Sequence, residues 1–167
     1  RVLGLSLNHR LSHLSSCLTS LPILVEIFSK KSDDEKFILS NGHAAVALYC
    51  LIEEMYDIDG EFLLKKHGIH PNRDEKNHLH CSSGSLGCGI CLSVGMAFAN
   101  RDKNVYCLIS DGECYCGSVW ESLHLKTKLK LDNLKIYVNI NGFSAYGTVD
   151  VNDLSNRLVS FCPDINL

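Results

Sequence analysis

Two residues with hard oxygen atoms, Asp111 and Asn141, each follow a short apolar run and stand next to a glycine. A carboxylate and a side-chain amide oxygen are ligands that Mg²⁺ accepts, and proteins often supply only one or two ligands while phosphates and water fill the octahedron. A main-chain carbonyl near Phe143 would be the third metal ligand that the protein supplies. We therefore expect a metal-bound diphosphate at these residues, although Asp-Gly and Asn-Gly are also ordinary turn dipeptides.

The runs before these residues predict two strands. Residues 105–109 (VYCLI) form an apolar run of strand length that leads to Asp111, and residues 134–140 (LKIYVNI) lead to Asn141. Uninterrupted apolar runs of this kind are typical of parallel strands that are buried on both faces.

A helix is predicted between the two strands, over residues 118–130 (SVWESLHLKTKLK), with Val119, Leu123 and Leu129 on one face and Ser118 as its N-cap. Strand-helix-strand units are nearly always right-handed parallel crossovers. Both strand ends should then lie at one edge of the sheet, where ligands of open α/β sheets bind.

Four segments resemble the transketolase family, in the order in which that family has them. Residues 110–122 (SDGECYCGSVWES) and 130–142 (KLDNLKIYVNING) look like its thiamine diphosphate motif, in which Gly-Asp-Gly is followed later by Asn. Residues 37–48 (FILSNGHAAVAL) resemble the family segment FVLSKGHAAPAL, and residues 83–97 (SGSLGCGICLSVGMA) resemble TGSLGQGLSIAVGMA. Residues 13–27 (HLSSCLTSLPILVEI) resemble its first-helix segment.

The resemblance implies an α/β fold with a mainly parallel sheet and helices on both faces, which binds thiamine diphosphate and Mg²⁺, or Ca²⁺ or Mn²⁺ in its place. Gly84 would let the main chain approach the cofactor, whereas a glycine turn before a helix is the simpler explanation. The implied metal ligands are Asp111, Asn141 and Phe143. The implied cofactor contacts are Ser83, Gly84, Ser85, Leu86, Ser110, Asp111, Gly112, Glu113, Asn141 and Phe143.

The resemblance also places His13, His43, His70 and Glu121 in catalytic positions. Imidazoles at such positions could hydrogen-bond the hydroxyl groups of a ketose and move protons while a carbon–carbon bond is cleaved. In transketolases the glutamate that matches Glu121 lies at the interface between subunits.

Simpler explanations exist for two of these residues. His43 precedes a predicted helix, Ala44 to Tyr56, for which Ser40 or Asn41 is a candidate cap, so it could be a first-turn surface group. Glu121 could be a solvated helix residue.

Two substitutions depart from the family pattern. Ser110 replaces the first glycine of Gly-Asp-Gly, and its backbone N–H remains available to a phosphate. Cys116 replaces a glutamate that links the two cofactor sites of the family by proton transfer, and a thiol does not carry that charge in the same way.

The composition is that of a soluble globular chain, with 46% hydrophobic residues and a net charge of −3 over 167 residues. Without a basic excess, a nucleic-acid partner is not expected. Residues 87–99 form too short and too glycine-rich a run to span a membrane. We expect one domain over residues 1–167 and a cytoplasmic location.

Nine cysteines are present, and Cys88 and Cys91 have the CxxC spacing of zinc and redox sites, with His78, His80 and Cys81 upstream. A zinc or redox module is therefore an alternative. We expect instead that Cys88 and Cys91 are buried as small hydrophobic residues, in a helix packed on the sheet.

Thiamine diphosphate enzymes of this family also need a pyrimidine-binding domain that carries an activating glutamate. The resemblance covers only the diphosphate-binding half, so we expect the other half on a separate chain, with two copies of each chain in a hetero-tetramer. The expected activity is transfer of a two-carbon ketol unit from a ketose, phosphorylated or not, to an aldehyde. The alternatives are a decarboxylating 2-oxo acid carboligase and a degenerate subunit that binds cofactor or partner without turnover. Cys116 argues for the degenerate subunit, and the presence of Asp111 argues against it.

Overall fold

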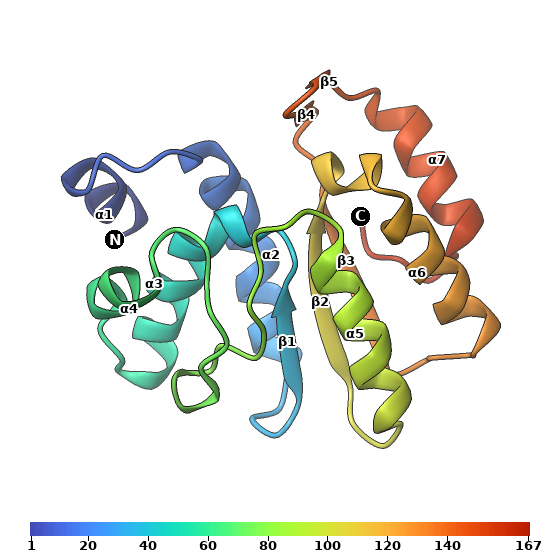
Figure 1. Ribbon diagram of the computed structural model, residues 1–167, viewed down its shortest axis with the longest axis horizontal. Coiled ribbons are helices and arrows are strands. Elements are labelled where there is room, and N and C mark those ends of the chain that lie inside the picture. Colours follow the sequence, from blue (N-terminus) through green and yellow to red (C-terminus); the bar gives the residue numbers. More distant parts are fainter.

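Three parallel strands form the central sheet of the computed structural model, which describes residues 1–167 (Figure 1). Their order is β1 (Lys36–Leu39), β2 (Val105–Ser110) and β3 (Leu134–Asn139), and both neighbouring pairs are parallel. The two predicted strands are confirmed, with ends that differ by one residue. A further short antiparallel pair, β4 (Phe143–Ser144) and β5 (Gly147–Thr148), follows β3.

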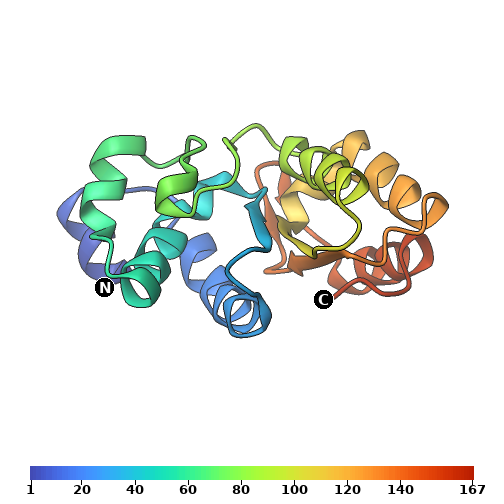
Figure 2. The ribbon, with the colours of Figure 1, turned by 90° about the horizontal axis from the view of Figure 1, so that it is seen from below.

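Helices cover both faces of the sheet, so the expected α/β fold class is confirmed. Figure 2 shows α5 and α6 on one side of the sheet and α2 on the other, and α7 packs beside α6. The helices are α1 (Val2–Asn8), α2 (Leu14–Lys30), α3 (Ala45–Tyr56), α4 (Gly60–His67), α5 (Cys88–Ala99), α6 (Gly117–Lys128) and α7 (Val151–Phe161). Short 3₁₀ turns occur at Gly42–Ala44, Glu75–Asn77 and Asp111–Tyr115. None of the helices combines the length and the apolar character that a membrane span requires.

The alternation of side chains along the strands supplies two apolar clusters, one on each face of the sheet. In β2, Tyr106 and Leu108 join the cluster beneath α2 and α3. Val105, Cys107 and Ile109 join the cluster beneath α5 and α6. Successive strand residues point to opposite faces, and both faces here are covered, which explains why the strands read as continuous apolar runs.

The predicted N-cap of the helix after β2 is wrong. The helix α6 begins at Gly117 with Cys116 in the cap position, and it ends at Lys128. The Ser118 hydroxyl instead donates to the Gly87 carbonyl at 3.0 Å. A Cβ atom on residue 87 would lie 2.4 Å from this hydroxyl oxygen, so glycine there allows the contact that removes Ser118 from the capping role.

The expected burial of Cys88 and Cys91 is also wrong, since both are exposed on α5. The face of α5 that packs on the sheet carries Gly89, Ser93 and Ala97 at four-residue intervals. Those positions face the sheet because they share one side of the helix, and the cysteines fall on the other side. No group of three or more His, Cys, Asp or Glu side chains could hold a metal ion, so the zinc alternative has no support.

His80 and His78, the histidines upstream of Cys88, make contacts with the segments around them. The Phe37 N–H, on the outer edge of the sheet, donates to His80 Nδ1 at 3.1 Å. Burial lowers the pKa of His80 to about 4. The His78 ring stacks on Tyr56 with 3.6 Å between ring centroids. Both side chains therefore have structural contacts away from the carboxyl ends of the strands.

Candidate functional site

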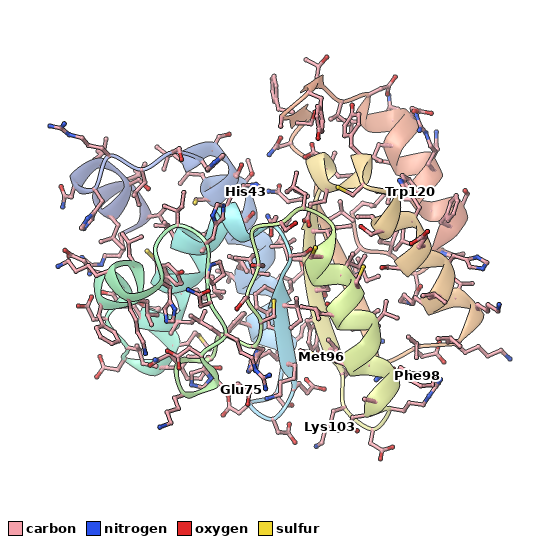
Figure 3. All side chains as sticks on the ribbon, viewed as in Figure 1. His43, Glu75, Met96, Phe98, Lys103 and Trp120 are labelled. Carbon is pink, nitrogen blue, oxygen red and sulfur yellow. The ribbon has the colours of Figure 1, made fainter.

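A cavity of about 590 Å³ lies where the carboxyl ends of the strands meet the start of α2. This is the edge of an open α/β sheet at which ligands bind. Figure 3 shows His43 there, above the carboxyl end of β1. The residues that line the cavity are His13, Ser15, Ser16, His43, His70, Gly84, Leu86, Ser110, Asp111, Gly112, Asn141, Phe143, Ser144 and Ala145.

Asp111 stands at the centre of this edge, one residue beyond β2, and only 1% of its surface is exposed. Its Oδ2 atom accepts hydrogen bonds from the N–H groups of Asn141 (3.0 Å) and Gly142 (2.8 Å). Its Oδ1 atom accepts the Gly112 N–H at 2.9 Å. Because β2 and β3 pair in parallel with Ser110 opposite Asn139, the carboxylate reaches the turn after β3 and is held in one orientation.

Asn141 lies beside Asp111 on the cavity wall, and its Oδ1 atom accepts the Phe143 N–H at 3.0 Å. Phe143 begins β4, and its residue surface is 69% exposed. The Ser110 hydroxyl, also on the wall, is buried and has no protein acceptor for its proton. Hard oxygen atoms and a free buried hydroxyl donor form a set that fits a divalent metal with its phosphate oxygens.

The three histidines named from the sequence line the same cavity. His13 precedes α2 with φ of 64°, and His43 lies in the 3₁₀ turn after β1. Their ring centroids are 5.1 Å apart. Burial, followed by the positive charges of His13 and His70, lowers the pKa of His43 from 6.5 to about 4. At neutral pH the His43 ring is therefore uncharged and can donate one hydrogen bond and accept another.

We expect His43 to titrate near pH 4 when its ring resonances are followed by NMR. Replacing His13 or His70 by glutamine should raise the pKa of His43, but by less than the effect of burial. The folded chain favours the neutral ring, so the unfolded chain takes up the proton first as the pH falls below 6.5. The free energy of unfolding therefore falls as the pH is lowered from 6.5 to about 4. A His43 pKa at its ordinary value would contradict the half-buried placement of this ring.

Gly84 allows the close approach of two walls of the cavity. Its φ of +134° is rarely adopted by other residues, and a Cβ atom there would lie 2.9 Å from Cγ of His70. Leu86 also lines the cavity, whereas Ser83 and Ser85 do not. The Ser83 hydroxyl is buried without a partner, and Ser85 is exposed.

Two other residues named from the sequence lie off the cavity wall. Glu113 is buried beneath it, and Glu121 is exposed on α6, away from it. Glu121 lines a separate apolar groove with Trp120 and Phe161. The candidate caps before His43 accept no capping hydrogen bond. The Ser40 hydroxyl instead donates to Glu113, and the Asn41 side-chain amide donates to Ser20.

Four further residues line the cavity that the sequence did not indicate, namely Ser15, Ser16, Ser144 and Ala145. Ser15 and Ser16 follow His13, so a search of that histidine's neighbours would have found them. Ser144 and Ala145 belong to the short hairpin after Phe143, for which the sequence has no apolar pattern.

A parallel sheet with helices on both faces, a fixed acidic residue at its carboxyl edge and a polar cavity there define an α/β domain with a ligand-binding edge. Residues 28–161 match the family described as transketolase, thiamine diphosphate binding domain. The chain therefore belongs to the transketolase family, as its sequence segments indicated.

Individual relatives agree with this assignment. Human transketolase is 34% identical over 149 residues, which are 77% of this chain and 24% of that protein. One of the subunits that make up the apulose-4-phosphate transketolase of Phocaeicola vulgatus is 30% identical, and the match covers 83% of this chain and 56% of that protein. The chain spans about a quarter of the length of the transketolases that it matches.

Solved structures show the same fold. The transketolase of Leishmania mexicana superposes with a TM-score of 0.65 at 26% sequence identity, over 77% of this chain and 23% of that one. The Campylobacter jejuni transketolase gives 0.63 at 26% identity, over 76% of this chain and 23% of that one.

Proposed function

We propose that this chain supplies the diphosphate-binding and metal-binding half of a transketolase-like enzyme, which transfers a two-carbon ketol unit from a ketose or phosphoketose to an aldehyde. The observation that carries the proposal is the cavity in which Asp111 and Asn141 lie together with three histidines. Family membership supports thiamine diphosphate as the cofactor.

Asp111 and Asn141, with the Phe143 carbonyl, would hold Mg²⁺ or a similar divalent ion. The Ser110 hydroxyl, which has no protein acceptor, would donate to a phosphate oxygen. The Gly84 and Leu86 segment would lie along the cofactor. Bound thiamine diphosphate supplies an electron sink for cleavage next to a carbonyl, and the protein supplies position and electrostatics.

The histidines would act on the sugar. A neutral His43 can accept a proton from a substrate hydroxyl, and His13, with its ring centroid 5.1 Å away, can share that hydrogen-bond network. His70 packs against Gly84 and would hold a further hydroxyl. Three imidazoles around one cavity suit a polyhydroxylated ketose better than a 2-oxo acid, which favours ketol transfer over a decarboxylating carboligase.

A separate pyrimidine-binding chain would supply the other half of the site, and two copies of each chain would assemble in the cytoplasm. The Phocaeicola vulgatus relative is named as one part of a transketolase that is divided between chains, which supports a divided enzyme here. Exposed Glu121 would then face the partner, and residues 1–167 would act as one domain.

Calorimetric titration of thiamine diphosphate with Mg²⁺ tests this proposal, first with the chain alone and then with a candidate pyrimidine-binding chain added. We expect binding that requires the metal and is tighter in the mixture, because a partner that binds the loaded state shifts the equilibrium. The mixture should also release aldehyde from a phosphoketose. Folded protein that gives no heat in either sample would instead make this chain a degenerate subunit.

A further inference from the structure

We propose that Glu113 is a positioning residue, which joins the three chain segments on which the cavity is built. The side chain is 0% exposed and lies beneath the cavity floor. Its Oε1 atom accepts the Ser40 hydroxyl at 2.6 Å and the Gly87 N–H at 2.9 Å. Its Oε2 atom accepts the Ser110 N–H at 3.0 Å.

Each hydrogen-bond partner of Glu113 is close in sequence to a residue on the cavity wall. Ser40 is the first residue after β1, on the way to His43, and Ser110 ends β2 immediately before Asp111. Gly87 follows Leu86 at the start of α5. One carboxylate therefore holds three parts of the cavity wall in place relative to one another. They are the segment that carries His43, the strand end that carries Asp111 and the loop that carries Leu86.

The close packing around this carboxylate leaves these segments little room to move. A Cβ atom on Gly89, in the first turn of α5, would lie 2.6 Å from the Ser40 Cα atom. The α5 backbone thus lies against the end of β1, directly beside the hydrogen bonds of Glu113. A small shift of α5 or of the end of β1 would break this packing contact between Gly89 and Ser40.

The energetics favour a role at the site over a role in folding alone. Burial raises the pKa of Glu113, and its three hydrogen bonds only partly oppose that effect. Burying a carboxylate is costly, and well-packed apolar residues often replace such groups without loss of stability. The carboxylate here supplies acceptors to two main-chain N–H groups and one hydroxyl, which an apolar side chain cannot do.

The test compares Glu113→Gln, which keeps the shape of the side chain, with Lys126→Met as a control. Lys126 is also buried, and its Nζ atom donates to Asp164 at 2.6 Å, at the far end of α6 from the cavity. Ser40→Ala removes one of the Glu113 contacts from the other side and serves if Glu113→Gln does not fold. Thermal unfolding of each variant gives its loss of stability.

Two measurements are made on each variant. In the first, thiamine diphosphate with Mg²⁺ is titrated calorimetrically into the chain, with partner where required. We expect about tenfold weaker binding for Glu113→Gln, the loss usual when a residue behind a ligand is changed, and wild-type affinity for Lys126→Met. In the second, NMR follows the rings of His43 and His70 without cofactor. Those resonances should shift in Glu113→Gln and Ser40→Ala but not in Lys126→Met.

The inference rests on the proposed function for its ligand, and the two measurements separate their failures. Wild-type chain that binds no cofactor overturns the proposed function, while the histidine resonances still decide the role of Glu113. Unchanged resonances in Glu113→Gln overturn the positioning role. Equal loss of affinity in Glu113→Gln and Lys126→Met at equal loss of stability also overturns it, because Glu113 would then act only on folding.

Discussion

Replacing Asp111 by alanine is expected to abolish the metal-dependent binding of thiamine diphosphate while the chain stays folded and soluble. The carboxylate is the only acidic group on the cavity wall, so the variant loses the one negative charge available to the metal. Removing a buried charged partner costs a complex about 3 kcal/mol or more, roughly a hundredfold in affinity. Calorimetry at fixed Mg²⁺ concentration measures this loss.

Two variants control for other causes of a loss in binding. Asp111→Asn keeps an oxygen that can accept from Asn141 and Gly142 but removes the charge, so it separates the metal from the turn geometry. Asp132→Ala removes an equal charge from an exposed position between α6 and β3 and should bind as wild type does. Undiminished binding by Asp111→Ala would place the metal site elsewhere.

The strand ends that carry Asp111 and Asn141 could be predicted because local patterns and the handedness of a crossover were enough to place them. The first strand, β1, is only four residues long, so no local pattern marked it as a strand. The exposure of Cys88 and Cys91 depended on which face of α5 meets the sheet. The buried side of that helix carries the small residues Gly89, Ser93 and Ala97 as well as Ile90 and Val94, and apolar residues also stand on the exposed side, so its apolar pattern did not mark the face.

The role of Glu113 could not be read from the sequence for a different reason. Its acceptors serve Ser40 and Gly87, which are 73 and 26 residues away along the chain. The resemblance placed Glu113 among the cofactor contacts, next to Asp111, whereas the structure turns its side chain beneath the cavity. Both residues lie in the 3₁₀ turn Asp111–Tyr115, and at three residues per turn two positions that are two residues apart point in different directions.

Replacing Gly42 by alanine is expected to destabilise the chain and to distort the cavity together. A Cβ atom at residue 42 would lie 2.6 Å from the Gly84 nitrogen and 2.7 Å from the Ser83 carbonyl carbon. Both are main-chain atoms, so the clash can be relieved only if the segments that carry His43 and Gly84 move apart. Forcing an additional group into a packed site costs about 1–3 kcal/mol, which corresponds to a fall of roughly 2–12 °C in Tm for a chain of this size.

Gly95→Ala is the matched control, since a Cβ atom there would have nothing within 4 Å and the residue lies within α5. Alanine is favoured over glycine in a helix by about 1 kcal/mol, so this variant should be at least as stable as wild type and bind the cofactor equally well. Thermal unfolding and calorimetry on both variants measure the two effects. If Gly42→Ala unfolds at the wild-type temperature and binds thiamine diphosphate as tightly, the two segments do not touch as described, and the cavity wall must be built from other contacts.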